Sequence, residues 1–229
     1  MDKTIPSRSA LHPDYLKGVL TFILAGGKGE RLYPLTRDRA KPAVPFGGAY
    51  RIIDITLSNC VNSGLRRIYL LSQYKSSSLM RHIAQGWDLF TGELGEFIYT
   101  VPPQLRVSSN WYLGTADALF QNIYTLEEER PELVLILSGD HIYRMDYRDM
   151  LAEHLDNDAD ATMAVISVPA SEAKRFGVVQ HDPAGWVTGF REKPSDLDPD
   201  GPDVVANMGV YLFKTEALVR AVSKDARRE

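Results

Sequence analysis

The sequence of 229 residues is 44% hydrophobic and 24% charged, which is typical of one globular domain with a substantial core. Its formal net charge of -4 argues against nucleic-acid binding, because phosphate contacts need a basic surface. A single cysteine, Cys60, excludes an internal disulfide, and the five histidines show no zinc-type spacing. No apolar stretch is long enough to span a bilayer, so we expect a cytoplasmic protein without nucleic-acid or membrane partners.

Short apolar runs alternate with helical segments along most of the chain. The runs expected to form buried parallel strands are 18–24, 67–71, 133–137 and 161–168. The segments expected to form helices are 52–63, 77–85, 115–129 and 147–155. Cys60 falls in the first helix, where we expect a buried, unreactive thiol, and Thr115 or Asp117 is expected to cap the third. The alternation predicts a Rossmann-like, doubly wound, mostly parallel α/β sheet.

The pattern changes after Pro169, where shorter β segments replace the alternating strands and helices. An Asp-Pro-Ala-Gly turn at 182–185 lies inside a β segment at 178–190, which predicts a β-hairpin appended to the sheet. A stretch rich in Pro and Asp at 195–203 is expected to be an exposed loop, and 204–213 is expected to return as a strand. Residues 218–229 are expected to form a terminal helix.

A glycine-rich loop follows the first strand. Gly26, Gly27 and Gly29 would let backbone amides approach an anion closely, and Arg31 adds a planar fork suited to phosphate oxygens. The spacing matches neither a Walker A loop nor a dinucleotide-binding fingerprint. Taken alone, the loop is explained equally well as a glycine turn beside a surface cation. Lys41, which precedes a proline, is either a second phosphate ligand or a solvated lysine.

Three further motifs carry candidate chemistry. Gly114 opens a helix, whose N-terminus attracts anions, although the aromatic residues just before it are equally typical of a core. Asp140 directly follows the buried strand at 133–137, a position suited to a Mg²⁺ ligand, or else it caps the next turn. Glu192 and Lys193 precede a proline and are suited to sugar hydroxyls and a sugar phosphate, or else form a surface ion pair.

In this order the motifs resemble the sugar-1-phosphate nucleotidyltransferases, whose pattern is Gly-Gly-x-Gly-x-Arg-Leu, then Lys-Pro, Gly-Asp and Glu-Lys-Pro. Within that group the sequence is most similar to the glucose-1-phosphate adenylyltransferases. The matching segments are 41–48, 51–54, 57–64, 110–117, 139–143 and 176–178. The resemblance implies a nucleotide-diphospho-sugar transferase fold and synthesis of ADP-glucose and pyrophosphate from ATP and glucose 1-phosphate, for glycogen-type polysaccharides. It also implies a homo-oligomer, a tetramer in the family.

The resemblance assigns roles to individual residues. The implied nucleotide contacts are Leu24, Ala25, Gly26, Gly27, Gly29, Arg31, Lys41, Gln73 and Gly114. The implied sugar-phosphate contacts are Tyr112, Gly177, Glu192, Lys193 and Asn207. The implied catalytic residues are Arg31, Asp140 and Lys193, with Asp140 as the ligand of a Mg²⁺ cofactor. A sugar phosphate is already an anionic nucleophile, so the chemistry needs charge compensation and positioning rather than a strong base.

The sequence also departs from the family pattern. Family members continue with a second metal-binding Asp and a C-terminal left-handed β-helix, so we expect 17–229 to be a truncated catalytic domain. Residues 1–16 are expected to form an N-terminal extension. Asp38 occupies a position where some regulated members carry an activator-linked lysine, which argues against activation by a sugar bisphosphate. Two alternatives stay open: uridylyl or guanylyl transfer to another sugar 1-phosphate, and a non-catalytic regulatory or ligand-binding subunit of the same fold.

Overall fold

The computed structural model describes residues 13–27, 29–103 and 112–226. The chain divides into two compact units, one comprising 1–162 together with 212–229 and the other comprising 163–211. Most of the expected N-terminal extension and the last three residues of the expected terminal helix lie outside the described residues. The extension enters the described part only as the short helix α1, Pro13–Lys17.

The first unit contains four parallel strands in the order β5-β4-β1-β6. They are β1 (Val19–Ala25), β4 (Arg67–Ser72), β5 (Phe97–Val101) and β6 (Leu133–Ser138). Six of the seven side chains of β1 are buried, because both of its neighbours and the covering helices exclude water from its apolar run. The expected α/β fold with a mostly parallel sheet is confirmed. Strand β5 was not predicted from the sequence.

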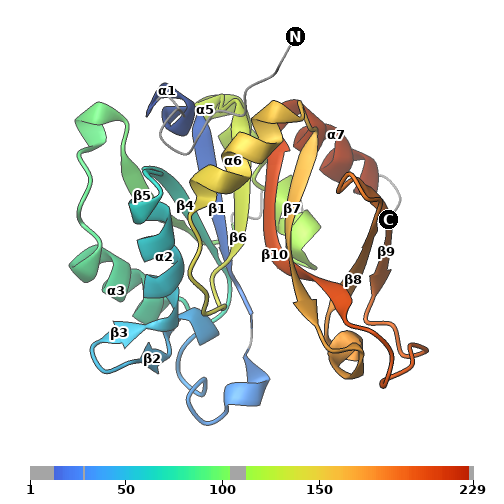
Figure 1. The fold of residues 1–229 in the computed structure, drawn as a ribbon. Coiled ribbons are helices and arrows are strands. Elements are labelled where there is room, and N and C mark those ends of the chain that lie inside the picture. Colours follow the sequence, from blue (N-terminus) through green and yellow to red (C-terminus); the bar gives the residue numbers. More distant parts are fainter. Residues whose placement is uncertain (1–12, 28, 104–111, 227–229) are drawn as a thin grey trace. The chain divides into compact units, whose positions relative to one another are not determined.

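Helices α2 (Ile52–Asn62), α3 (Ser77–Gly86) and α6 (Tyr147–Asp156) lie within a residue of the predicted segments. Figure 1 shows α2 and α6 on the near side of the parallel strands. The helix α7, Thr215–Asp225, begins three residues earlier than expected and contacts β6. The hydroxyl of its first residue, Thr215, donates to the carbonyl of Pro131 at 2.7 Å, which ties the start of α7 to the segment just before β6.

The prediction of one helix over 115–129 is wrong, because the chain forms α4 (Thr115–Phe120) and then α5 (Ile123–Glu129). The break falls at the buried Asn122, which has non-helical dihedral angles. Its amide donates to the Ala118 carbonyl at 2.7 Å and to the Tyr112 hydroxyl at 3.0 Å, so the side chain satisfies groups around the break. The expected side-chain cap is also absent: Gly114 is the N-cap, and Asp117 instead accepts from the Leu113 N–H.

Short elements complete the first unit. Strands β2 (Pro45–Phe46) and β3 (Tyr50–Arg51) pair antiparallel. The single-turn helices are η1 (Glu30–Leu32), η2 (Lys41–Ala43) and η3 (Gly92–Leu94). Cys60 is fully buried in α2, and burial raises the pKa of its thiol, as expected for an unreactive cysteine.

The second unit is built around the predicted hairpin of β8 (Gly177–His181) and β9 (Val187–Glu192), which pair antiparallel. Strand β10 (Val204–Lys214) pairs antiparallel with β8 and also pairs β7 (Ala161–Val168). The ends of β7 and β10 belong to the first unit. The expected exposed loop at 195–203 has no regular structure.

The expectation that 161–168 is a buried strand is half wrong, because β7 forms but remains largely open to solvent. Val165 is 42% exposed and Ile166 51% exposed. The second unit, all of whose residues are described, contains only the short helical segment η4 (Ala170–Arg175). No helix of this unit is therefore long enough to cover the face of β7.

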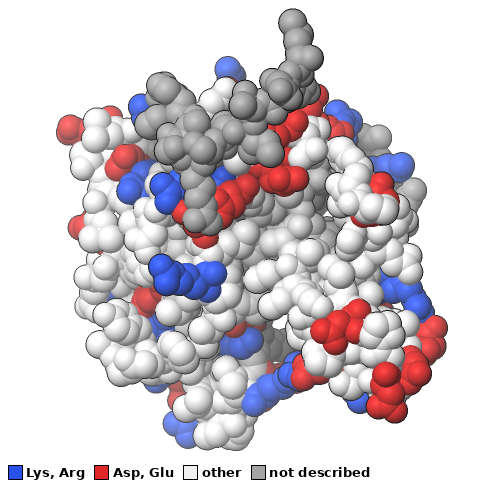
Figure 2. Space-filling model, viewed as in Figure 1, with Lys and Arg blue, Asp and Glu red and all other residues white. Residues whose placement is uncertain are grey.

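Charged side chains of both signs are interspersed on the face shown in Figure 2, and the coloured residues form no continuous basic surface there. This distribution agrees with the formal net charge of -4. Among the described residues, none of the helices has both the length and the apolar character needed to cross a membrane.

Candidate functional site

The glycine-rich loop leaves the carboxyl end of β1 and turns sharply into η1. Gly29 has a φ of 65°, and a Cβ placed on it would lie 2.8 Å from the Cβ of Lys41 and 2.9 Å from the methyl group of Thr36. Both the left-handed backbone and the close packing therefore require glycine here. The Thr36 hydroxyl donates to the Gly29 carbonyl at 2.9 Å, which fixes the turn.

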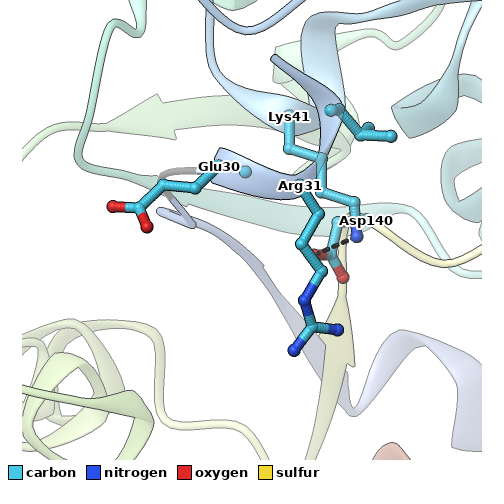
Figure 3. A pocket seen from close by; sticks show the side chains of 6 residues that line it. Glu30, Arg31, Lys41 and Asp140 are labelled. Carbon is cyan, nitrogen blue, oxygen red and sulfur yellow. Dashed lines mark hydrogen bonds and ion pairs between the residues drawn. The ribbon is translucent and has the colours of Figure 1, made fainter.

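Lys41 and Asp140, which are 99 residues apart in the sequence, form an ion pair of 2.9 Å between Nζ and Oδ2. Lys41 comes from η2, and Asp140 follows the end of β6. Both side chains are 28% exposed and line a pocket of about 350 Å³, together with Gly29, Glu30, Arg31 and Leu32. Figure 3 shows Arg31 extending from η1 beside this pair, whereas Glu30 points away. The structure thus places two cations and one carboxylate at the glycine loop.

Both carboxylate oxygens of Asp140 accept hydrogen bonds. Oδ1 accepts from the Ser138 hydroxyl at 2.6 Å, and Oδ2 accepts from Lys41. Burial by itself raises the pKa of Asp140, but the hydrogen bonds from Ser138 and Lys41 and the charge of Lys41 outweigh it, so the pKa lies below its usual value. His141 is close, with Nε2 3.6 Å from Oδ1. Asp140 is therefore held as an anion at the end of β6.

The site fits a hard divalent cation with few protein ligands. Asp140 offers oxygen donors, and the Lys41 ammonium on Oδ2 marks a position where positive charge is already stabilised. Within the described ranges, no three His, Cys, Asp or Glu side chains gather closely enough to form a metal cluster. A cation bound here would therefore take most of its ligands from a phosphate substrate and water.

The predicted nucleotide contacts Gly26 and Gln73 lie side by side. A Cβ on Gly26 would be 3.1 Å from both Cβ and Oε1 of Gln73, and Gln73 donates to the Tyr112 carbonyl at 3.1 Å. Gly114 is exposed in extended backbone, and a Cβ there would meet no atom within 4 Å. Tyr112, a predicted sugar-phosphate contact, therefore lies next to Gln73, a predicted nucleotide contact. Residues 110–111 of the motif lie outside the described residues.

Leu24 and Ala25 form the end of β1, where the Leu24 carbonyl accepts from the Gly139 N–H at 2.9 Å. A Cβ on Gly139 would lie 3.0 Å from Ile23 and Ile53 side-chain atoms, so glycine allows β6 to turn toward Asp140 at this point. This bond joins the ends of the two central strands from which the glycine loop and Asp140 emerge.

The remaining predicted residues belong to the second unit. Lys193 has a φ of 43°, its N–H donates to the Phe176 carbonyl at 3.0 Å, and its ammonium pairs with Glu192 at 2.7 Å. A Cβ on Gly177 would clash with the Phe190 ring and lie 3.1 Å from Oε2 of Glu192. Glu192, Lys193 and Gly177 are therefore neighbours. The Asn207 amide donates to the Tyr211 hydroxyl, and its oxygen accepts from the Gly209 N–H.

Sequence reasoning missed two residues that shape the site. Ser138 holds Oδ1 of Asp140, and Thr36 holds the Gly29 carbonyl. Ser138 carries one usable signal, since it is a hydroxyl at the carboxyl end of a buried strand two residues before the candidate ligand. Thr36 carries none, because its role depends on a turn whose path the sequence does not reveal.

A parallel α/β sheet whose strand ends carry a glycine loop, two cations and a carboxylate defines a phosphate-binding domain of the nucleotide-binding class. The nucleotidyl transferase family model matches residues 20–229, and the chain belongs to that family.

Several curated relatives are similar over most of the chain. Glucose-1-phosphate adenylyltransferase of Koribacter versatilis is 58% identical over 212 residues, which cover 90% of this chain and 51% of the relative. Glucose-1-phosphate adenylyltransferase 2 of Vibrio cholerae is 54% identical, covering 93% of this chain and 53% of the relative. The enzyme of Rhodopirellula baltica is 52% identical, covering 97% and 51%. The chain thus spans about half the length of these relatives.

Proposed function

We propose that this domain transfers an adenylyl group from ATP to glucose 1-phosphate and belongs to a protein that makes ADP-glucose for glycogen-type polysaccharides. A phosphate oxygen of glucose 1-phosphate attacks the α-phosphorus of ATP, the bond from that phosphorus to the bridging oxygen breaks, and pyrophosphate leaves with the electron pair. No proton has to move. The observation that carries the proposal is the grouping of Arg31 and Lys41 with Asp140 at the glycine loop, and the names of the relatives supply the substrates.

In this proposal the first unit binds the nucleotide. The amides of Gly26, Gly27 and Gly29 and the side chains of Arg31 and Lys41 hold the triphosphate, where they offset the charge that gathers on the departing pyrophosphate. The remaining nucleotide contacts are Leu24 and Ala25 at the strand end and Gln73 and Gly114 around the adenine.

Asp140 would hold a Mg²⁺ ion. When bound, this ion neutralises phosphate charge and helps to align the triphosphate. Ser138 fixes one oxygen of Asp140 and leaves Oδ2, now occupied by Lys41, as the atom that would face the ion. The Lys41 ammonium, which pairs with Asp140 in this structure, could then contact the triphosphate instead.

Most of the sugar-phosphate contacts are assigned to the second unit. Lys193 would neutralise the phosphate, Glu192 would accept hydrogen bonds from the hydroxyl groups, and Gly177 and Asn207, with Tyr112 of the first unit, would complete the contacts. The left-handed backbone of Lys193 is consistent with a constrained functional position, since non-glycine residues seldom adopt it without a compensating gain. We further propose a cytoplasmic location and a homo-oligomer, a tetramer by analogy with the family.

The test is pyrophosphate release from ATP and glucose 1-phosphate with Mg²⁺, with UTP and GTP in parallel. The assay is run on the 229-residue chain and on the complete gene product. Release that is selective for ATP supports the proposal. Selectivity for UTP or GTP would move the assignment to another nucleotide, and ATP binding without release from either protein would favour a ligand-binding subunit.

A further inference from the structure

In the segment 29–40, which carries Arg31, only Thr36 and Ala40 are buried. Tyr33 is 70% exposed and Leu35 is 56% exposed. Figure 1 shows this segment, in blue, running beyond the end of β1 before the chain reaches β2. Its hydrogen bonds are mostly local, such as Leu32 N–H to the Gly29 carbonyl at 3.0 Å and Leu35 N–H to the Leu32 carbonyl at 2.8 Å. Something outside the segment must fix its position if Arg31 is to meet a ligand.

Lys75, which lies between β4 and α3, makes three hydrogen bonds to this segment. Its ammonium donates to the carbonyls of Arg37 and, at 3.4 Å, Thr36. Its carbonyl accepts from the N–H of the buried Ala40 at 3.3 Å. Among the hydrogen bonds of the described residues, these alone tie 29–40 to a part of the chain beyond the adjoining η2 turn.

The backbone of Lys75 is itself unusual, with a φ of 47° in the left-handed region that non-glycine residues adopt infrequently. This conformation turns its carbonyl and its side chain toward the same segment. Gln73, two residues earlier, packs against Gly26 and holds Tyr112. Lys75 therefore connects the nucleotide-facing end of β4 with the segment that carries Arg31 and leads into Lys41.

We propose that Lys75 is a positioning residue that locks the segment 29–40 in place, so that Arg31 and Lys41 face the triphosphate. Lys75 does not need to touch the substrate: its ammonium donates hydrogen bonds to the carbonyls of Thr36 and Arg37, and its own carbonyl accepts from the N–H of the residue just before Lys41. The effect of Lys75 on ATP binding rests on the proposed function, whereas its effect on the position of the segment 29–40 does not.

The test combines hydrogen exchange of peptides covering 29–40 with direct ATP binding. Lys75→Met removes the ammonium, and losing charge-assisted hydrogen bonds should speed exchange and weaken ATP binding by about tenfold or more each. Lys75→Asn keeps a residue that tolerates the left-handed backbone but lacks the ammonium, and should behave like Lys75→Met. Lys75→Arg should retain most of the protection and affinity.

The matched control is Lys214→Met, because the Lys214 ammonium also donates to a backbone carbonyl, that of Asp158 at 2.9 Å, but serves no predicted ligand. It should leave exchange over 29–40 and ATP affinity unchanged. Unchanged exchange in Lys75→Met or Lys75→Asn would overturn the proposal, as would faster exchange with wild-type ATP affinity. If the wild-type chain binds no ATP, the proposed function is wrong. The hydrogen-exchange measurement still shows whether Lys75 holds the segment 29–40 in place.

Discussion

Asp140 is the residue on which the proposed chemistry depends most directly, since it is the carboxylate that faces both cations of the glycine loop. Asp140→Asn keeps the size of the side chain and an acceptor for Ser138 but removes the charge. We expect turnover to fall by about a hundredfold or more, because the charge is needed where the metal acts. ATP affinity should change little, since the glycine loop and Arg31 remain.

Pyrophosphate release and equilibrium ATP binding measure these two effects. Asp38→Asn is the matched control, because Asp38 is an exposed carboxylate that pairs with its neighbour Arg37. Its turnover should match the wild type. Wild-type turnover in Asp140→Asn would remove this residue from the catalytic assignment.

His154 gives a prediction about pH and stability. It is 1% exposed on α6, with Nδ1 2.8 Å from the Thr162 hydroxyl. Burial, and next the charge of Lys214, lower the pKa of His154 below its ordinary value, although Asp158 and Asp160 oppose the shift. The unfolded chain therefore takes up a proton at a higher pH than the folded chain does. The stabilisation is present above the unfolded pKa and is lost as the pH falls toward the folded pKa.

His154→Gln keeps a group that can bond Thr162 but does not titrate. The wild type should lose free energy of unfolding between about pH 7.5 and about pH 5.5, and the variant should lose less. Urea unfolding at the two pH values measures this difference. An equal loss in both proteins would show that other groups dominate the pH dependence.

At the scale of elements, the break between α4 and α5 is held by one side chain. Asn122→Leu leaves the Tyr112 hydroxyl and the Ala118 carbonyl without their donor in a buried place. We expect a loss of about 1–3 kcal/mol in the free energy of unfolding, the usual range for a buried polar group left unpaired. Tyr112→Phe removes one acceptor only and should cost less. A cost in Tyr112→Phe equal to that in Asn122→Leu would assign the stabilisation to the tyrosine instead.

The same region shows what sequence patterns reveal. Helices α2, α3 and α6 were predicted because an apolar stripe at helical spacing depends only on neighbouring residues. The break at Asn122 was not, because its alternative partner, the Tyr112 hydroxyl, comes from a separate part of the chain. Strand β5 was missed although its sequence, Phe-Ile-Tyr-Thr-Val, is rich in the aromatic and β-branched residues that are typical of strands.

In the candidate site, too, features set by neighbouring residues were predicted and features set by distant partners were not. Gly29, Lys41 and Asp140 were found because their motifs have a fixed order, and the resemblance supplied their meaning. Strands β1 and β6 are parallel neighbours, so the glycine loop and Asp140 emerge at one edge of the sheet, where Lys41 of η2 lies 2.9 Å from Asp140. Lys75 was not found, because it acts through hydrogen bonds that no spacing along the sequence indicates, whereas Ser138 was missed although its place two residues before Asp140 is visible in the sequence.

At the scale of the whole molecule, the proposed contacts divide largely by substrate between the two units. Every proposed nucleotide contact lies in the first unit, whereas four of the five proposed sugar-phosphate contacts, Gly177, Glu192, Lys193 and Asn207, lie in the second. Substitutions should therefore separate the two Michaelis constants. Lys193→Ala should raise the Michaelis constant for glucose 1-phosphate by about tenfold or more, as expected when a hydrogen bond to a charged group is lost, and leave that for ATP nearly unchanged.

Arg31→Gln should do the reverse, because it removes the fork that faces the triphosphate and leaves the second unit intact. Initial rates of pyrophosphate release, with each substrate varied in turn, measure both constants. Lys174→Ala is the control, because Lys174 is an exposed lysine of the same unit as Lys193 in the η4 segment, and both constants should keep their wild-type values. If Lys193→Ala altered only the constant for ATP, the sugar phosphate would have to bind elsewhere, and the division of substrates between the units would be wrong.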